Sequence, residues 1–358
     1  MVCLKSLSMT VLFLLMLSLS PCLFPQISGH QDWQKLPRGC ASCHVGHGLP
    51  GTAMLPTSEE EFCYQCHGDF NEFETAVRKN LLPANLKMKN LRGVFRKPYR
   101  HPVELKTLSS VNTADYISRK NDIYAFTRSE CLDCHRGHGV TRFDHAPGTS
   151  PRRSPKNERE FEYQLCYQCH TRIIQSSLAK KDIKGWFDPT NPSYHPIEAA
   201  GKNSEVPSLK APYSVAGVIN CTDCHNSDDP DGPQGPHGSM YEYLLERRCN
   251  LNDNIPESGS QYALCYKCHD RDSILNDESF PYHQRHIVQA RTSCFTCHHS
   301  HGSQRNSHLI KFNESTDPFI IQPSSSGRLE FFDSGRFSGE CFLRCHGVDH
   351  NPGVYSRR

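Results

Sequence analysis

The chain has 358 residues, of which 40 are Lys or Arg and 38 are Asp or Glu. This near balance of charge excludes the strongly basic class of proteins that bind nucleic acid, and the pair Arg152-Arg153 is interpreted as solvated loop charge. Hydrophobic residues make up only 36% of the chain, whereas 19 residues are Cys and 21 are His. This composition indicates an interior that side chains alone do not fill.

The first 29 residues are predicted to be a secretory signal peptide. Lys5 is followed by the apolar run 11–19, and a small-residue exit lies near Ser28-Gly29. The run is too short to span a bilayer, and no later segment is apolar enough to do so. Lipidation of Cys22 is a less favoured alternative, because Pro21 stands where a lipobox has a small residue. The sequence therefore predicts an exported bacterial protein without a transmembrane segment, in the periplasm, at the cell exterior or associated with the outer membrane.

Eight motifs with two cysteines and an adjoining histidine follow this segment. Seven have the form Cys-x-x-Cys-His, and the eighth, at Cys341, is the longer Cys-x-x-x-Cys-His. The two thiols of each motif can form thioether bonds to one haem, and the His can then ligate its iron. Zinc ribbons and disulfides, the alternatives for so many cysteines, need no His after every second Cys. The motifs therefore predict eight covalently attached haems c.

The predicted site residues follow directly from these motifs. The attachment cysteines are Cys40, Cys43, Cys63, Cys66, Cys131, Cys134, Cys166, Cys169, Cys221, Cys224, Cys265, Cys268, Cys294, Cys297, Cys341 and Cys345. The proximal iron ligands are His44, His67, His135, His170, His225, His269, His298 and His346. Cys249 lies outside the motifs and is interpreted as a spare thiol.

Eight haems would change both the charge and the core of the protein. Their propionates would make the loaded protein acidic. The mature chain offers only about 40 residues for each haem, so the porphyrins themselves would form most of the buried apolar surface. The 24 Pro and 23 Gly interrupt regular structure throughout. We therefore expect mostly loops and short α-helices organised around stacked haems, folding that depends on haem, and little β structure.

Few regular elements are predicted in detail. The Cys-x-x-Cys-His stretches themselves are expected to be helical, and plausible helices cover residues 72–82, 163–178 and 240–248. One C-terminal β-hairpin is predicted from strands at residues 318–322 and 328–332, joined by the turn Ser324 to Gly327.

The motifs come in pairs, and the pairs repeat four times. First members continue into His-Gly, as in Cys131-Leu-Asp-Cys134-His135-Arg-Gly-His138-Gly139, and second members have Cys-Tyr-x-Cys-His, as at Cys166. Tyr/His elements follow at Tyr99, Tyr194 and Tyr282. The predicted division is a signal peptide at 1–29 and dihaem repeats at 30–115, 116–205, 206–287 and 288–358.

This pattern resembles the doubled-CxxCH multihaem cytochromes c, over nearly the whole mature chain. The ending, residues 338–352, looks like the C-terminus of a subgroup in which the longer Cys-x-x-x-Cys spacing recurs. The resemblance implies that Cys341 and Cys345 carry a haem. The third repeat departs from the pattern by an insertion before Pro236, and the last repeat lacks a Tyr-His-Pro element.

The second axial ligand of most or all haems is predicted to be His. The mature chain contains only Met54, Met88 and Met240, whereas 13 of its 21 His lie outside the proximal positions. The predicted distal ligands are His47, His101, His138, His195, His237, His286, His301 and His350. His47 lies on the same side of the iron as His44, so it must serve a neighbouring haem. The reserves are His30, His145, His283, His299 and His308.

Closely packed haems with two axial His favour electron transfer in anaerobic or extracellular respiration, without catalytic residues. The expected partners are redox proteins, either other multihaem cytochromes or a quinol-oxidising membrane complex, with an outer-membrane conduit or an extracellular acceptor as further candidates. The alternative is a multihaem reductase of nitrite, hydroxylamine or tetrathionate with one open haem. Such enzymes often replace the proximal His by Lys, which no motif here does. The longer motif at Cys341 is the expected place for an open site.

Overall fold

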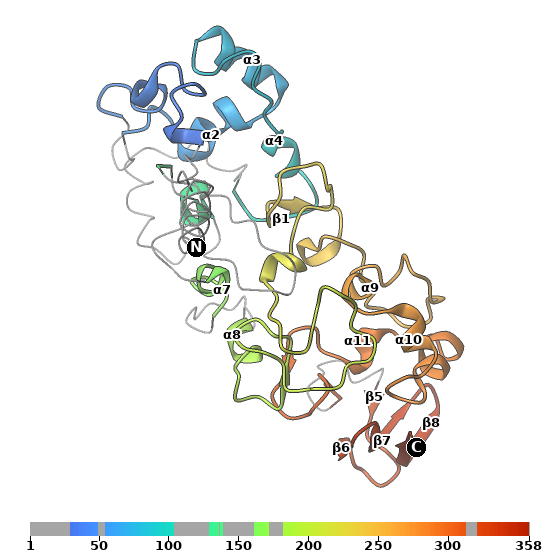
Figure 1. Cartoon of the computed structure of the whole chain (residues 1–358). Coiled ribbons are helices and arrows are strands. Elements are labelled where there is room, and N and C mark those ends of the chain that lie inside the picture. Colours follow the sequence, from blue (N-terminus) through green and yellow to red (C-terminus); the bar gives the residue numbers. More distant parts are fainter. Residues whose placement is uncertain are drawn as a thin grey trace, which may run out of the picture.

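The structure, a computed structural model, describes residues 29–48, 54–103, 129–135, 137–138, 161–171, 182–312 and 321–357. Nearly all of the predicted signal peptide, residues 1–28, lies outside the described residues. The described elements succeed one another along an elongated molecule, from helices α2 to α4 at one end to strands β5 to β8 at the other (Figure 1). Within these ranges, no helix has the length and apolar character to cross a membrane.

Helices are short throughout the described chain. The α-helices are α2 (Glu59–His67), α3 (Phe70–Arg78), α4 (Leu91–Val94), α6 (Cys131–Cys134), α7 (Glu162–Cys166), α8 (Ile183–Trp186), α9 (Cys265–Cys268), α10 (Arg271–Leu275) and α11 (Cys294–Cys297). Single 3-10 turns are η2 (Gly29–Gln31), η3 (Gly39–Ser42), η5 (Cys221–Asp223) and η6 (Glu242–Leu244), and η7 (Arg285–Gln289) is a π-helical turn. The prediction of mostly loops and short helices is confirmed.

The predicted helix at 72–82 forms with shifted ends. It is α3, which begins at Phe70 because the Asp69 carboxylate accepts hydrogen bonds from the backbone N–H groups of Asn71 and Glu72. The Glu72 carboxylate in turn accepts from the Asp69 N–H at 2.7 Å. This capping box satisfies the first backbone donors of the helix and so fixes its start.

Two other helix predictions fail or are shortened. At 240–248 only the turn η6 forms, because Tyr243 and Leu244 have φ values of 58° and 59°. The Ser239 hydroxyl also donates to the Leu245 carbonyl at 2.6 Å, which closes a loop instead of a helix. The helix predicted at 163–178 is α7 and ends at Cys166, and residues 172–178 lie outside the described part of the chain.

Two short strand pairs join distant repeats. In the first clip, β1 (Tyr99–Arg100) pairs with β3 (Gly238–Ser239), and in the second clip β2 (Ser193–Tyr194) pairs with β4 (Gly302–Ser303). A Cβ atom at Gly238 or Gly302 would lie 2.1 or 2.0 Å from a carbonyl oxygen of another segment. Glycine is therefore needed at both positions for the backbones to approach.

The C-terminal strands form a four-stranded antiparallel sheet, so the prediction of a single hairpin is wrong. The strands are β5 (Ile321–Gln322), β6 (Glu330–Gly335), β7 (Ser338–Cys345) and β8 (Val348–Ser356). Both β5 and β6 pair with β7, and β8 also pairs with β7. The turn at Ser324 closes through its N–H, which donates to the Arg328 carbonyl at 2.8 Å. β5 and β6 therefore both pair with β7 and not with each other, whereas a hairpin of β5 with β6 was expected.

The apolar core consists of small separate clusters. One contains Ile310, Phe312, Ile321 and Leu343 and packs against the β7 face that carries Cys341 and Cys345. The others centre on Tyr64, with Phe95 and Val103, and on Ala76, with Leu81 and Leu82. At least one motif cysteine packs against each cluster. The predicted attachment sites therefore border the few apolar regions that the chain forms by itself.

Candidate functional site

Each Cys-x-x-Cys-His motif folds as a tight helical turn. In the six motifs outside α2, the N–H of the His donates to the carbonyl of the first Cys at 2.9 to 3.0 Å. The remaining motif, Cys63 to His67, lies within α2. A helical turn places residues three and four apart on one face, so each turn presents two thiols and an imidazole together. The sequence prediction of helical motif stretches is confirmed for these seven.

The third residue of several motifs stabilises this turn. Asp133 accepts a hydrogen bond from the Glu130 N–H at 2.9 Å, and Asp223 accepts one from the Asn220 N–H at 2.8 Å. In α11 the direction is reversed, because the Ser293 hydroxyl accepts from the Thr296 N–H at 3.2 Å. These contacts satisfy backbone donors at the start of the turns. Sequence reasoning missed them, although an Asp or Thr inside the motif was a visible signal.

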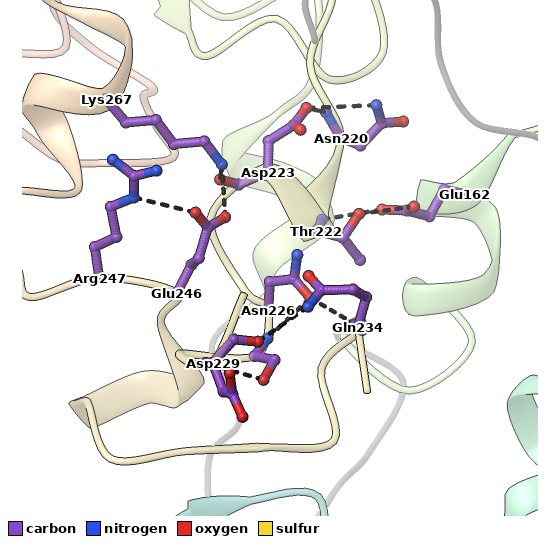
Figure 2. Close-up of polar contacts among 12 residues, drawn as sticks. Glu162, Asn220, Thr222, Asp223, Asn226, Asp229, Gln234, Glu246, Arg247 and Lys267 are labelled. Atoms are coloured by element: carbon purple, nitrogen blue, oxygen red, sulfur yellow. Dashed lines mark hydrogen bonds and ion pairs between the residues drawn. The ribbon is translucent and has the colours of Figure 1, made fainter. Parts of the chain in front are cut away.

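Buried glutamates connect the second motif of one repeat to the first motif of the next. The Glu162 carboxylate accepts hydrogen bonds from the Thr222 N–H and hydroxyl, both at 3.0 Å, and Figure 2 shows this contact between the two segments. The Glu59 carboxylate accepts from the Leu132 N–H in the same way. Both glutamates stand four residues before a motif, at Cys166 and Cys63. This repeated spacing is the signal that could have predicted them.

A lysine inside the sixth motif binds the fifth. The Lys267 ammonium donates to the Asp223 carbonyl at 2.7 Å and to the Glu246 carboxylate at 2.6 Å, as Figure 2 shows. The Lys267 and Glu246 side chains are 16% and 18% exposed, so this ion pair is largely shielded from water. Two motifs whose cysteines are 44 residues apart in sequence are thereby held side by side.

Cysteines of successive motifs also touch. The Cys63 thiol is hydrogen-bonded to Cys131, and the Cys221 thiol to Cys166, and these contacts together with burial raise the pKa of Cys63 and Cys221. Cys265 is hydrogen-bonded to Cys294 and also to Cys249, the thiol outside the motifs. Motifs 2 and 3, 4 and 5, and 6 and 7 are therefore direct neighbours.

Weaker contacts complete the row. Burial raises the pKa of Cys66 to about 11 and that of Cys224 to about 12, and neighbouring motif cysteines, Cys43 and Cys268 respectively, add repulsion. Cys297 in the same way lies near Cys345 and Cys341. Motifs 3 and 4 are joined by the first clip. The backbone N–H of His101, whose ring lies near His170 of motif 4, donates at 3.3 Å to the backbone carbonyl of His237, whose ring lies near His135 of motif 3. The eight motifs thus follow one another in space as they do in sequence.

Most motif histidines face a second histidine. The ring centroids are separated by 5.7 Å for His44 and His138, 5.8 Å for His67 and His30, 5.9 Å for His135 and His237, 6.3 Å for His170 and His101, 6.2 Å for His225 and His301, and 6.5 Å for His298 and His283. His269 has His195 as a neighbour. Burial first, and then the charge of His195, lower the pKa of His269 to about 4.

These separations fit the predicted cofactor. An iron bound in line by two imidazoles, with Fe–N bonds of about 2 Å and ring centres about 1 Å beyond the nitrogens, holds the centroids roughly 6 Å apart. The Nε2 atoms of His44 and His138 are 3.5 Å apart, a little closer than two such bonds require. The six ring separations therefore come close to those of an iron held between two imidazoles, beside the motif cysteines that would attach the haem.

The facing histidines are only partly those that the sequence predicted. Four predicted distal residues, His101, His138, His237 and His301, lie opposite a motif histidine, and a fifth, His195, lies near His269. Two reserves, His30 and His283, take the remaining positions. Within the described ranges, no histidine ring is placed against His47. The reserve His145 lies outside the described residues, and His299 stacks on Trp186 at 4.0 Å.

The second ring nitrogen is anchored in many of these pairs. Nδ1 lies within hydrogen-bonding distance of a backbone carbonyl in His30 (Gly137, 2.8 Å), His101 (Pro236, 2.5 Å), His195 (Ser300), His225 (Tyr243, 2.9 Å) and His298 (His308, 2.9 Å). Metal-ligating histidines usually donate the nitrogen that does not bind metal to such an acceptor, which fixes the tautomer and the ring orientation. Nε2 is then directed toward the facing histidine.

Burial keeps three of these imidazoles, those of His67, His237 and His298, neutral. It lowers the pKa of His67 and of His298 to about 4, with smaller effects from neighbouring groups. It lowers the pKa of His237 to about 4 as well. Neutral imidazole is the form that ligates a metal, so the rings are ready to bind iron at neutral pH.

The eighth motif differs from the other seven, because its longer Cys-x-x-x-Cys-His sequence is not helical. Cys341 and Cys345 lie on strand β7, and His346 follows in the turn to β8 with φ of 49°. His346 does not face a histidine in the described part of the chain. Its Nε2 is bonded to Asp253 Oδ2 at 2.9 Å, and the Asp253 side chain is only 6% exposed. The two remaining predicted distal ligands, His286 and His350, lie with their ring centroids 6.3 Å apart.

Metal sites of another kind do not appear among the described residues, where no three His, Cys, Asp or Glu side chains form a group able to hold a metal ion. The motif cysteines form no disulfide bonds with one another.

Comparison with known proteins agrees with the motif analysis. Residues 35–72 and 213–274 match the family model of the doubled CXXCH motif. The first match takes in the motifs at Cys40 and Cys63, and the second takes in those at Cys221 and Cys265. The predicted resemblance is thereby confirmed. No curated protein and no solved structure was found to match the chain.

Proposed function

We propose that this chain, which carries the doubled CXXCH motif of multihaem cytochromes c, is an exported octahaem electron carrier. The doubled motif by itself suggests a multihaem cytochrome c that takes part in electron transfer and has redox proteins as partners. Eight attachment sites, closed iron coordination and export go beyond that statement. The observation that carries the proposal is the set of histidine pairs, each at the spacing that one iron requires.

The chain's residues set the character of these sites. A haem held between two imidazoles supplies a one-electron ferric/ferrous couple with both axial positions filled. The facing histidines exclude substrate from the iron, and the carbonyls bonded to Nδ1 keep the rings from turning away. Such positions suit electron transfer rather than chemistry on a bound molecule.

The clips and glutamate contacts support transfer along a row. In the second clip, the backbone N–H of His195 donates to the backbone carbonyl of His301 at 2.9 Å. His301, which faces motif 5, and His195, which lies near motif 6, are therefore adjacent beside the paired strands β2 and β4. Glu162 and Lys267 hold motifs 4 and 5, and motifs 5 and 6, together. We propose that the sites exchange electrons in sequence order, with a donor at one end of the molecule and an acceptor at the other.

The export part of the proposal rests on the first 29 residues and on the chemistry of c-type attachment, which takes place on the oxidising side of the membrane. The mass of the mature N-terminal peptide tests it, with a start near residue 30 expected and a start at Met1 excluding export. A peptide beginning at a lipidated Cys22 would instead give an outer-membrane-associated protein. The proposed partners are other multihaem cytochromes or a quinol-oxidising complex, with an outer-membrane conduit or an extracellular acceptor at the far end.

The competing function is a multihaem reductase with one open iron. The observation that favours it is the eighth motif, whose own His346 is held by Asp253 and not opposite another histidine. Carbon monoxide added to the reduced protein distinguishes the two functions, because it binds only where an axial position is open. The electron carrier binds none, and a reductase binds one per eight haems and turns over nitrite, hydroxylamine or tetrathionate with a reduced dye.

A further inference from the structure

A short helix that is followed by a buried phenylalanine occurs twice in the chain. Phe95 follows α4 and Phe187 follows α8, and each of these residues is 5% exposed. We propose that these two phenylalanines are positioning residues, which hold the rings of His237 and His301 nearly parallel to the motif histidines that they face. This inference rests on the proposed function, since it assumes an iron between the paired rings. It adds the residues that set the orientation of two axial ligands.

The same local contacts build both helices. The Asn90 side chain accepts a hydrogen bond from the Gly93 N–H at 2.7 Å, and the Asp182 side chain accepts one from the Gly185 N–H at 3.1 Å. Such a cap satisfies a backbone donor and fixes where a helix begins. Each phenylalanine stands five residues after its cap, so both reach equivalent places. The two sequences are Asn90-Leu-Arg-Gly93-Val-Phe95 and Asp182-Ile-Lys-Gly185-Trp-Phe187.

Both helices end against the glycines of the clips. A Cβ atom at Gly238 would lie 2.1 Å from the Val94 carbonyl oxygen, and one at Gly302 would lie 2.0 Å from the Trp186 carbonyl oxygen. Each of these glycines directly follows a histidine that faces a motif. The close approach of the two backbones, which glycine permits, therefore brings each phenylalanine to that histidine.

The phenylalanine and histidine rings meet edge to face. The ring centroids of Phe95 and His237 are 5.5 Å apart with the planes inclined at 72°, and those of Phe187 and His301 are 5.2 Å apart at 64°. Aromatic rings prefer this arrangement. Turning either imidazole about its bond to Cβ would break the contact. Phe95 is itself held by Tyr64, at 6.5 Å. The contacts therefore restrain the plane of each imidazole.

The two histidine pairs with this contact have the smallest angles between ring planes among the described pairs. The angle is 21° for His135 and His237, and 27° for His225 and His301. Near-parallel rings therefore accompany the helix and its phenylalanine in both places. The other angles are 42° for His44 and His138, 44° for His298 and His283, 62° for His170 and His101, and 64° for His67 and His30.

A third phenylalanine shows why the origin of the contact matters. Phe280 also meets His283 edge to face, at 5.2 Å, although His283 and His298 are inclined at 44°. Phe280 lies three residues before His283 in the same segment, so the two side chains move together. Phe95 and Phe187 lie 142 and 114 residues before the histidines that they contact. They can therefore hold those rings against a separate part of the chain.

The angle between axial imidazoles affects the electronic state of an iron between them. Each ring donates π electron density to the iron d orbital that lies perpendicular to the ring plane. Two parallel rings act on the same d orbital and separate its energy from that of its partner, whereas crossed rings act on both orbitals alike. Axial ligands are one of the means by which a protein tunes such a site. Phe95 and Phe187 would therefore give motifs 3 and 5 an electronic state that differs from that of motifs 2 and 4.

The test compares Phe95→Leu, Phe187→Leu and the double variant with the unaltered full protein. Mass of the denatured protein counts covalent haem, and low-temperature EPR of the oxidised protein reports ring orientation. Near-parallel imidazoles give a low-spin signal with three well-separated g values, whereas steeply crossed imidazoles give one large g value. Leucine keeps the apolar bulk but lacks the ring edge. We expect each single variant to keep eight low-spin haems and to lose a near-parallel signal worth one haem in eight, and the double variant to lose two.

Two kinds of control accompany these variants. Phe95→Tyr and Phe187→Tyr keep a ring edge and should keep the unaltered spectrum. Phe312→Leu removes a phenylalanine of similar burial, 6% exposed, whose ring packs against Phe331, and should also keep both near-parallel signals. Unchanged signals or high-spin iron in the two leucine variants, or the same loss in any control, would overturn the inference and leave the electron carrier in place. An unaltered protein without haem would overturn the proposed function itself.

Discussion

Replacing Glu162 by Ala should loosen the contact between the fourth and fifth motifs. The Glu162 carboxylate, 8% exposed, accepts two hydrogen bonds from Thr222, which is 9% exposed. A hydrogen bond to a charged group contributes about 1.5–3 kcal/mol, so losing both should lower the free energy of local opening by roughly 3–6 kcal/mol. At about 1.4 kcal/mol per factor of ten, the Thr222 amide should exchange roughly a hundred to ten thousand times faster.

Hydrogen–deuterium exchange on the loaded protein, followed in peptides that span residues 219–226, measures this effect. Glu162→Gln keeps one acceptor for the Thr222 N–H and should accelerate exchange by about tenfold. Asp272→Ala is the control, because its carboxylate is 84% exposed and 3.7 Å from Arg271, a contact that contributes little. Unchanged protection of Thr222 in Glu162→Ala would refute the claim that this carboxylate holds the two motifs together.

Three further predictions concern the pairs, the burial of charge and the clips. His30→Ala should turn one haem in eight high-spin, whereas His47→Ala should leave the EPR spectrum unchanged; the reverse result would restore the sequence-based assignment. Burial raises the pKa of Glu59 to about 7, so the folded state holds this proton more tightly than the unfolded state does. The free energy of unfolding should therefore fall as pH rises from about 5 to 7. In urea titrations Glu59→Gln should flatten this pH dependence, and an unchanged slope would contradict the prediction. In Gly302→Ala the added Cβ should displace the second clip, which adjoins His195 and His301, so carbon monoxide should bind at two haems. Gly259→Ala, whose added Cβ meets open space, should bind none.

The sequence predicted the local parts of the site well. The seven regular motifs form the expected turns because the conformation of five consecutive residues depends mostly on their own hydrogen bonds. His138, His237 and His301 were identified because the His-Gly position recurs in several repeats. The repeated element around Tyr99 and Tyr194 also forms paired strands.

The pairing of histidines was beyond the sequence, because it depends on contacts between distant segments. His30 faces His67 from a turn that carries no motif, and strand pairs of only two residues decide the neighbours of His101 and His237. The same limit applies to Glu162, whose partner is 60 residues away.

One turn of the C-terminal sheet could have been predicted from the sequence. His346 and Gly347, with φ of 49° and 76°, form the two-residue turn that joins β7 to β8. Left-handed residues followed by glycine are typical of such hairpins. The Cys341 motif, with one more residue between its cysteines than the other seven, lies on a strand, where positions four apart share a face.

The closed coordination of every haem is the central claim, and low-temperature EPR of the fully oxidised protein tests it most directly. Spins are quantified against covalent haem counted by mass. The account predicts eight haems and low-spin signals for all of them, since the proposed function gives each iron two axial ligands. A high-spin signal equal to one haem in eight or more would contradict the account and direct attention to an open, reactive site.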